Sequence, residues 1–387
     1  MRSNNIPQGY KQTELGIIPE DWNIKSIGEF LSIGNGHDYK GKSFGNIPVY
    51  GTGGIITHID DYLYDGQTIC IGRKGTIDKP IFHSGKIWTV DTLYYTYNFI
   101  DIEVKFIYYL LLTIDWMSLN EATGVPSLTS DRIKQITLAL PPIAEQRAIA
   151  EALSDVDGLI AALDKKIAKK RLLKQGAMQQ LLTGKKRLPG FTDEWVNVQI
   201  KQLGKWSKGQ PFSKDKINRD GKNPCIHYGE LFSYGEVIET IKSNTDIKPY
   251  VKSSGKDVLF PASDVTPIGL GRCSALNVKN VLLGGDIIIL ELTKDCPAYI
   301  SYVVNLNKQH IIDRVTGTTV KHINSNLLGE IKINISIDIK EQQAIATILS
   351  DMDKEITDLE AQRDKYRLLK SGMMQKLLTG QIRLKTE

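Results

Sequence analysis

The sequence lacks several features that would point to a particular class of protein. Its four cysteines (Cys70, Cys225, Cys273 and Cys296) stand far apart, which excludes a structural zinc site with closely spaced ligand pairs. We expect these cysteines to be reduced thiols. No apolar run reaches the roughly 18 residues that a membrane-spanning helix needs, and the first residues contain no apolar signal-peptide core. We therefore expect a soluble, cytoplasmic protein that does not contact a membrane.

Motifs for catalysis are missing as well. The only Pro-Pro pair, Pro141-Pro142, lacks the preceding Asn or Asp and the following aromatic residue that adenine methyltransferases use to hold a flipped base. The sequence has no Gly-x-x-x-x-Gly-Lys-Ser/Thr loop to bind the phosphates of ATP. Its six histidines show no i, i+4 pairing. We expect no catalytic residue, metal site or cofactor in this chain.

The overall composition is that of a folded protein. The chain has 387 residues, which is enough for two or three domains. Hydrophobic residues make up 41% and charged residues 24%, which excludes a wholly disordered chain. The net charge of +5 is compatible with nucleic-acid binding, but many unrelated enzymes are equally basic.

The strongest feature is an internal duplication. Glu145 corresponds to Glu341 and Gly184 to Gly380, with the same offset of 196 residues. Over the 44 aligned positions 25 residues are identical, which excludes chance. A repeat this long is not a solenoid unit, which has about 20–50 residues. Two copies imply a pseudo-two-fold relation inside one chain.

Weaker duplications enclose two unlike regions. Asp21-Trp22 resembles Glu194-Trp195, and Thr123–Ser127 resembles Thr316–Val320, whereas residues 30–122 and 206–315 are not similar to each other. The predicted domains are a first variable domain over 1–140 with a conserved segment at 1–29, a helical segment over 141–186, a second variable domain over 187–337, and a second helical segment over 338–387.

Each duplicated segment predicts a long helix with an apolar seam. The first helix is expected from about Ile143 to Thr183, with Gly184 as a stop signal. Apolar residues recur at spacings of three and four, as in a coiled coil. The second seam breaks at Arg363 and is expected to resume at Tyr366 and Leu369. The predicted seam residues are Leu153, Val156, Ile160, Leu163, Ile167, Leu349, Met352, Ile356, Leu359 and Tyr366.

The two helices have two possible apolar partners. Because both need one of matching length, we expect them to pair with each other; the alternative is that each packs on its own domain. Thirty paired residues would form a rod of roughly 45 Å, equivalent to about 13 base pairs of DNA. Gly176 and Gly372 indicate a close helix approach or a kink. The basic run over 165–174 could contact phosphates or keep the helix soluble.

These motifs carry a family resemblance. The segments GYKQTELGIIPEDW (Gly9–Trp22) and RLPGFTDEW (Arg187–Trp195), with the paired EQRAI/EQQAI and LLTG motifs, resemble the specificity subunit of type I restriction–modification systems, HsdS. The resemblance covers the whole chain. It implies an α+β protein in which two pseudo-two-fold-related α/β target-recognition domains are separated by two long helices that form an antiparallel coiled coil.

The resemblance also implies a function and partners. The chain would recognise a bipartite, asymmetric site in double-stranded DNA and would itself be non-catalytic. It would dock two modification (HsdM) methyltransferase subunits and restriction (HsdR) subunits, which would use S-adenosylmethionine, ATP and Mg. Three alternatives stay open: a methylation-only system, an adaptor that never contacts DNA, and an enzyme with an unrecognised active site.

The first variable region contains a candidate DNA contact. Arg73, Lys74 and Thr76 lie in a glycine-flanked turn after an apolar strand, where glycines permit close backbone approach and basic side chains can bond phosphate or guanine. A solvated hairpin explains the same pattern. Lys40 and Lys42 are weaker candidates.

Further candidates come from the loops and the second region. Hydroxyl-rich loops suit phosphate binding but fit an ordinary turn as well. The basic stretch of the second region suits DNA or a solvated face, and Arg272, after Gly271, is the nearest parallel to Arg73. These candidates are Ser127, Lys208, Lys214, Lys216, Arg219, Arg272, Thr318, Thr319 and Lys321.

Overall fold

The structure is a computed structural model that describes residues 6–248 and 250–384. Residue contacts divide the chain into two compact units. Unit 1 extends to Asp164 and resumes at Gln362, whereas unit 2 runs from Lys165 to Ala361. Each unit therefore contains one variable region and one end of each duplicated segment. The domain boundaries inferred from the sequence, which detach the helices from the variable regions, stay a prediction.

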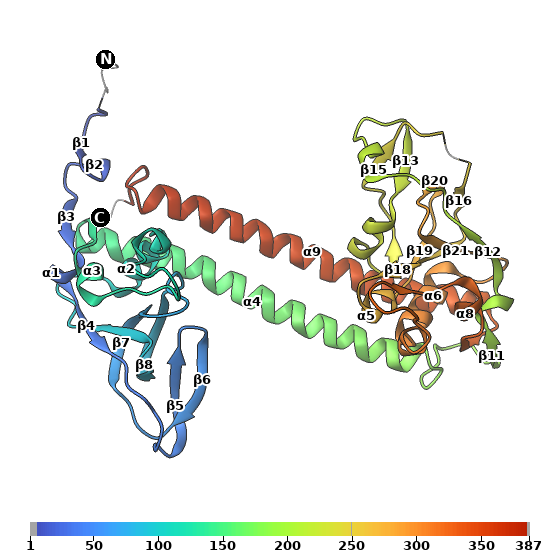
Figure 1. Cartoon of the computed structure of the whole chain (residues 1–387), viewed down its shortest axis with the longest axis horizontal. Coiled ribbons are helices and arrows are strands. Elements are labelled where there is room, and N and C mark those ends of the chain that lie inside the picture. Colours follow the sequence, from blue (N-terminus) through green and yellow to red (C-terminus); the bar gives the residue numbers. More distant parts are fainter. Residues whose placement is uncertain (1–5, 249, 385–387) are drawn as a thin grey trace. The chain divides into compact units, whose positions relative to one another are not determined.

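Two helices of 39 residues dominate the duplicated segments (Figure 1). Helix α4 spans Ile143–Leu181 and α9 spans Ile339–Leu377. Gly184 and Gly380 follow them with a φ of 71°, a left-handed conformation that glycine adopts without strain. The first helix thus begins at the predicted residue and ends two residues early. Among helices of the described residues, none is both long and apolar enough to cross a membrane.

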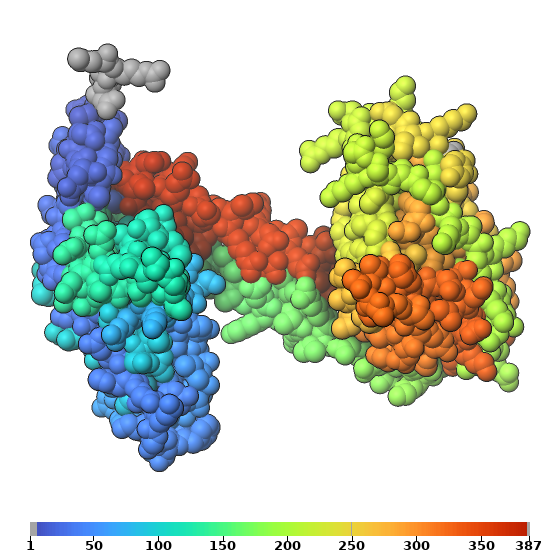
Figure 2. Space-filling view, viewed as in Figure 1, coloured from blue at the N-terminus to red at the C-terminus, as the bar shows by residue number. Residues whose placement is uncertain are grey.

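All ten residues of the predicted seam are buried or half-buried. The helices pack antiparallel in both units, and α9 lies directly against α4 (Figure 2). In unit 1, Lys370 pairs with Asp157 at 2.6 Å and Arg363 with Asp164 at 3.3 Å. The expectation for Leu369 is wrong, since 50% of this residue is exposed.

Three basic residues of α4 have a role that the sequence did not reveal. In unit 2, Lys170 pairs with Glu355 of α9 at 2.7 Å, and Arg171 pairs with Glu360. Lys174 is buried and bonds Asp353. These three side chains therefore link the two helices, whereas Lys165, Lys166 and Lys169 are exposed.

The elements of unit 1 form an α+β fold around a six-stranded sheet with the order β4-β9-β7-β8-β5-β6. Two small two-stranded sheets, β1-β2 and β10-β3, accompany it. In chain order the elements are β1 (Tyr10–Thr13), β2 (Gly16–Pro19), β3 (Asn23–Ser26), α1 (Ile27–Phe30), β4 (Ser32–Asn35), β5 (Phe44–Gly51), β6 (Gly54–Ile59), β7 (Tyr64–Gly72), β8 (Ile81–Thr89), β9 (Leu93–Tyr97), α2 (Val104–Leu111), η1 (Trp116–Leu119), α3 (Ser130–Lys134) and β10 (Thr137–Leu140).

Unit 2 contains two larger sheets, with the orders β12-β21-β17-β19-β14 and β15-β13-β20-β16, and the pairs β11-β23 and β18-β22. Its elements are β11 (Trp195–Gln199), η2 (Ile200–Gln202), β12 (Gly204–Lys208), η3 (Lys214–Lys216), β13 (Asn223–Ile226), η4 (Tyr228–Ser233), β14 (Val237–Ile238), β15 (Ser243–Thr245), β16 (Lys252–Ser254), β17 (Asp257–Pro261), β18 (Ser263–Asp264), α5 (Pro267–Leu270), β19 (Ser274–Leu276), β20 (Lys279–Leu283), β21 (Ile287–Leu292), α6 (Pro297–Leu306), α7 (Gln309–Ile312), β22 (Lys321–His322), α8 (Ser325–Gly329) and β23 (Lys332–Ser336).

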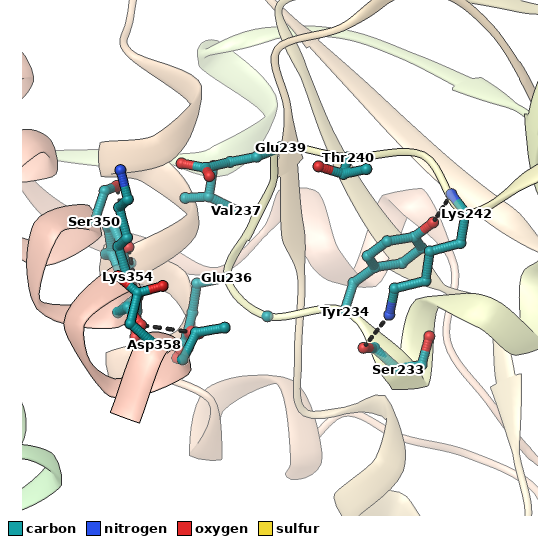
Figure 3. A pocket seen from close by; sticks show the side chains of 14 residues that line it. Ser233, Tyr234, Glu236, Val237, Glu239, Thr240, Lys242, Ser350, Lys354 and Asp358 are labelled. Atoms are coloured by element: carbon teal, nitrogen blue, oxygen red, sulfur yellow. Dashed lines mark hydrogen bonds between the residues drawn. The ribbon is translucent and has the colours of Figure 1, made fainter. Parts of the chain in front are cut away.

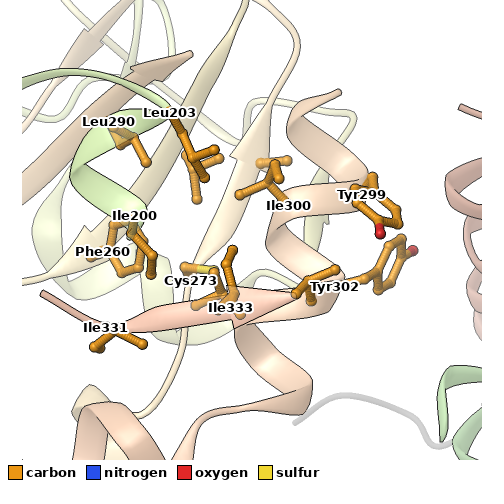
Figure 4. Packing of buried hydrophobic residues seen from close by; sticks show 14 of the residues in the cluster. Ile200, Leu203, Phe260, Cys273, Leu290, Tyr299, Ile300, Tyr302, Ile331 and Ile333 are labelled. Atoms are coloured by element: carbon orange, nitrogen blue, oxygen red, sulfur yellow. The ribbon is translucent and has the colours of Figure 1, made fainter. Parts of the chain in front are cut away.

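The helix ends belong to the hydrophobic cores of the units. In unit 1, Leu153 of α4 and Leu377 of α9 join a core built on β7 and α2. In unit 2, Leu181 and Leu349 join a core built on β17 and α6, in which Tyr299 and other large side chains are fully buried (Figure 4). The helices therefore pair with each other as expected, and their ends also pack in the cores of both units. The alternative that each helix packs separately on its own domain is wrong.

The duplicated short motifs form the same local structure in both units, which we call the frame. In unit 1 the frame comprises β3, α1, α3 and β10, and in unit 2 it comprises β11, η2, α8 and β23. Each frame has an antiparallel strand pair, β3 with β10 or β11 with β23. A capping box begins the first helical turn in both, made by Ser26 and Glu29 or by Gln199 and Gln202.

A buried carboxylate joins the frame of unit 1 to the helices. Glu145, at the start of α4, is 3% exposed. It accepts bonds from Arg383, just beyond α9, through Nε at 2.7 Å and Nη2 at 2.6 Å. Trp22 Nε1 donates to the same carboxylate at 3.3 Å. Arg383 also bonds Asp21 and holds the pKa of that carboxyl below its usual value.

Unit 2 repeats this arrangement with the helices exchanged. Glu341, at the start of α9, is fully buried and accepts two bonds from Arg187, just beyond α4, at 2.7 and 2.9 Å. Trp195 Nε1 donates to it at 3.2 Å. In each unit, the buried glutamate at the start of one long helix is therefore paired with an arginine that follows the other long helix. This explains why the Glu, Trp and Arg motifs are duplicated together.

The helix glycines do not serve an internal close approach. A Cβ added at Gly176 or Gly372 would meet no described atom within 4 Å. Both residues are exposed on the outer surface of their helices. The prediction that they permit α4 and α9 to approach each other is therefore wrong.

The buried carboxylate of unit 1 yields a test of stability. Arg383→Met would leave the buried Glu145 carboxylate without its ion-pair partner. We expect the free energy of unfolding to fall by about 3 kcal/mol, the lower end for a broken buried pair, because 32% of the Arg383 side chain is exposed. The measurement is urea denaturation of the full chain. The matched control is Arg367→Met, since Arg367 makes a surface pair with Asp164 and should cost less than about 1 kcal/mol. Equal losses for the two variants would contradict the role of Glu145.

Candidate nucleic-acid interface

The glycine-flanked turn of unit 1 presents two exposed basic residues. Arg73 and Lys74 follow β7, and both donate their backbone N–H to Thr92 O. Gly72 is required, because an added Cβ would lie 2.2 Å from Thr76 O, and Gly75 has a φ of 96°. The backbone of the turn is therefore fixed while both basic side chains remain exposed.

The environment of Arg73 orients its guanidinium. Its carbon Cζ lies 5.8 Å from the centre of the Tyr94 ring, and Nη1 donates to Asp91 O at 3.3 Å. Most of its donors remain for a ligand. Thr76, by contrast, is half-buried.

The structure brings this turn together with the loop Glu121–Ser127. Lys74 and Ser127 form an antiparallel bridge, and Gly75 N donates to Pro126 O at 2.8 Å. The loop closes on itself through Glu121 N and Ser127 O at 3.1 Å. Two segments that the sequence proposed separately thus form one surface. Ser127 itself is half-buried, whereas residues 123–125 are exposed.

Unit 2 has an equivalent loop, Thr316–His322. Thr316 N donates to His322 O at 3.0 Å and His322 N to Thr316 O at 2.8 Å, so this loop also has seven residues. When the two loops are aligned by these closing hydrogen bonds, Thr316 corresponds to Glu121 and Thr318 to Thr123. The sequence comparison, which aligned Thr123 with Thr316, was two residues out of register.

The candidate residues of this second loop differ in role. Thr318 and Thr319 are exposed at its tip. Lys321 donates from Nζ to Gly317 O and Thr318 O, both at 2.8 Å. Lys321 therefore stabilises the loop, because its ammonium group donates two hydrogen bonds to carbonyl groups of the loop itself.

Arg272 is not the counterpart of Arg73. Its guanidinium donates to Phe232 O at 3.1 Å and to Tyr234 O, and burial lowers its pKa. These internal bonds argue against a base contact by Arg272. The residue of unit 2 that corresponds to Arg73 is instead Ala262. In unit 1, Arg73 O accepts from Leu128 N, just after the loop, and in unit 2, Ala262 O accepts from Ile323 N in the same way.

The weaker candidates of unit 1 form ion pairs at the surface. Lys42 bonds Asp61 at 2.7 Å, lies 5.0 Å from the centre of the Trp88 ring, and holds the pKa of Asp61 below its usual value. Lys40 is more exposed and lies 3.7 Å from Asp38.

One residue of the basic stretch of unit 2 lines a cleft. Lys214 and Lys216 lie on η3, Arg219 follows, and all three are exposed. Lys208, at the end of β12, lines a cleft of about 700 Å³. Sequence analysis did not single out two other residues that line it, His227 and Asp286, because their contribution depends on the folding of distant turns. The one sequence feature that pointed to this site was the pair Gly284-Gly285 before Asp286, which is typical of a turn.

A second cavity of unit 2 does not suit DNA. It has a volume of about 450 Å³ and lies between the β14 region and α9 (Figure 3). Its walls carry four carboxylates and the ammonium groups of Lys242 and Lys354, and Lys174 pairs with two of the carboxylates, so the cavity has no excess positive charge to attract phosphate. The carboxylates are those of Glu236, Glu239, Asp353 and Asp358.

The buried cysteines are poor nucleophiles. Burial raises the pKa of Cys70 and Cys273 to about 12 and that of Cys225 to about 11. A thiol with such a pKa is protonated at pH 7. Within residues 6–248 and 250–384, no three His, Cys, Asp or Glu residues are grouped as metal ligands would be.

A separate surface consists of exposed leucines that occur in both repeats, which we call the leucine surfaces. On α4 it comprises Leu172 and Leu173, which are 69% and 50% exposed, beside Gly176. On α9 it comprises Leu368 and Leu369, which are 76% and 50% exposed, beside Gly372. Exposed leucine pairs at matching positions of the two repeats are candidates for a binding surface.

Comparison with known proteins gives consistent results. The family model described as the type I restriction modification DNA specificity domain matches residues 19–170 and 192–366. The putative type I restriction enzyme MjaX specificity subunit of Methanocaldococcus jannaschii is 24% identical over 425 residues, covering 98% of both chains. The MjaVIII specificity subunit of the same organism is also 24% identical, covering 95% of this chain and 94% of the relative.

One solved structure supports the fold. The type I restriction-modification S subunit from M. genitalium has a TM-score of 0.71 and 14% identity, covering 100% of this chain and 99% of its own. The matches to the family model include both variable regions and most of both long helices. The chain therefore belongs to the type I restriction modification DNA specificity family.

Proposed function

We propose that this chain is the DNA-binding specificity subunit of a type I restriction–modification complex and recognises a bipartite, asymmetric site. The observation that carries the proposal is the duplicated frame. Two frames with the same strand pair, capping box and buried carboxylate hold variable sheets of different topology. A shared frame with unlike contents suits two units that contact DNA in the same way but recognise different bases.

The loops beside the frames are the proposed points of contact. Each is a seven-residue loop joined to the strand end of its variable sheet, by the Lys74–Ser127 bridge in unit 1 and the Ser263–His322 pair in unit 2. Exposed hydroxyls, backbone N–H groups and the Arg73 guanidinium suit phosphate and base contacts. The exposed lysines Lys214 and Lys216 of unit 2 would add phosphate contacts.

In this proposal the paired helices set the gap between the two half-sites. An α-helix is stiff and rises 1.5 Å per residue, so its length fixes a distance. The buried seam and the ion pairs in both units would prevent the helices from sliding past each other.

The leucine surfaces are the proposed docking sites for modification subunits. Two equivalent surfaces suit two copies of one partner. Because Gly176 and Gly372 leave space at the helix surface, a partner helix could pack closely there. Methyl transfer would take place on these partners with S-adenosylmethionine. Restriction subunits, with ATP and Mg, would complete the assembly.

The first test is methylation. We expect the chain, combined with its modification subunit, to methylate adenine in a two-part motif. We also expect its DNA affinity to fall steeply with salt, because counterions are released on binding. Methylation sequencing of cells with and without the gene identifies the motif. An identical methylome in both, with the modification subunit present, would contradict the proposal.

The second test concerns docking. The double variant Leu172→Gln/Leu173→Gln should lose one of two bound modification subunits, because each buried leucine contributes about 1.5–3 kcal/mol. Native mass spectrometry of the purified complex measures the stoichiometry. Leu159→Gln is the matched control, since Leu159 is also exposed on α4 but corresponds to Glu355 in the other repeat. Two subunits bound to the double variant would refute docking at this surface.

A further inference from the structure

The cleft beside Lys208 is built on close backbone contacts. Gly209 N donates to Ile287 O at 3.0 Å, and a Cβ on Gly209 would lie 1.8 Å from Gly284 O. A Cβ on Gly285 would lie 2.8 Å from Pro211 Cα. The glycines therefore allow the segment after β12 to lie directly on the turn between β20 and β21. The polar side chains that line the cleft project from this fixed base.

Those side chains offer both donors and an acceptor. Lys208 and Asp286 are exposed, and among the described residues neither forms a salt bridge. Gly229 N–H donates to His227 Nδ1 at 3.3 Å, which leaves Nε2 as the N–H of the neutral ring. The Phe212 ring packs edge-on against His227, with 5.4 Å between ring centres, and restrains it.

The cleft adjoins the part of unit 2 that corresponds to the basic turn of unit 1. Ala262, which takes the position of Arg73, donates its N–H to Asp286 O at 2.9 Å. In unit 1, Arg73 N donates to Thr92 O in the same way. Unit 2 therefore lacks basic side chains at this turn, with Ala262 and Ser263 in place of Arg73 and Lys74, and has the cleft next to it.

We infer that this cleft recognises a G·C base pair through the major groove, in the half-site contacted by unit 2. Lys208 and His227 would donate to guanine O6 and N7, and Asp286 would accept from the cytosine N4 amino group. Lysine with guanine and aspartate with cytosine are the pairings that base-edge geometry favours. This inference rests on the proposed function and adds which residues determine its specificity.

The test is a binding selection from randomised duplex DNA with the full chain and its modification subunit. We expect the wild-type complex to select G·C at one position that Asp286→Asn relaxes by about tenfold or more. Lys208→Gln should relax the same position. The other half-site should be unchanged in both variants. Because Lys208 and Asp286 are exposed, melting temperatures should match that of the wild type.

Lys205→Gln is the matched control. Lys205 is exposed on the same strand as Lys208, but three residues away, so it points to the opposite face and does not line the cleft. This variant should keep the wild-type base preference.

The outcomes separate this inference from the proposed function. If the wild type selects a two-part site but Asp286→Asn and Lys208→Gln keep every preference, or relax an A·T position, the inference is overturned while the function stands. If the wild type selects no site at all, the proposed function fails and the inference fails with it.

Discussion

The antiparallel packing of α4 against α9 is the interaction on which the rest of the structure depends. Each unit contains one end of both helices, and its core includes leucines from both, Leu153 with Leu377 in unit 1 and Leu181 with Leu349 in unit 2. The arginine that follows one helix neutralises the buried glutamate that begins the other. Each unit therefore needs residues from both long helices. A duplicated helix start with its glutamate requires a duplicated helix end with its arginine.

This constraint separates what is shared from what varies. The two frames have the same strand pair and capping box, and a seven-residue loop and the start of a long helix accompany each of them. The sheets held by the frames are free to differ, as the six-stranded sheet of unit 1 and the two sheets of unit 2 do. At equivalent positions, unit 1 has the glycine turn with Arg73, whereas unit 2 has Ala262 and the neighbouring cleft with Asp286.

Local patterns in the sequence predicted the helices and their seam, because apolar spacing and stop signals depend on neighbouring residues. Contacts between distant segments were not predictable. The partner of Glu145 lies 238 residues away, Arg272 resembled Arg73 in its glycine neighbour but is bonded inside the domain, and unlike inserts shifted the loop alignment by two residues. The exposure of Leu369 was missed because a heptad pattern does not show where the seam ends.

The most direct test of the account is to lengthen the paired helices. One heptad would be inserted after Leu163 and another between Gln362 and Arg363, close to the Asp164–Arg363 pair that faces it. Seven residues add about 10 Å, or roughly three base pairs. Methylation sequencing should then show both half-sites unchanged and the gap between them longer by about that amount. An unchanged gap, or altered half-sites, would contradict the claim that the helices fix the spacing between two independent recognition units.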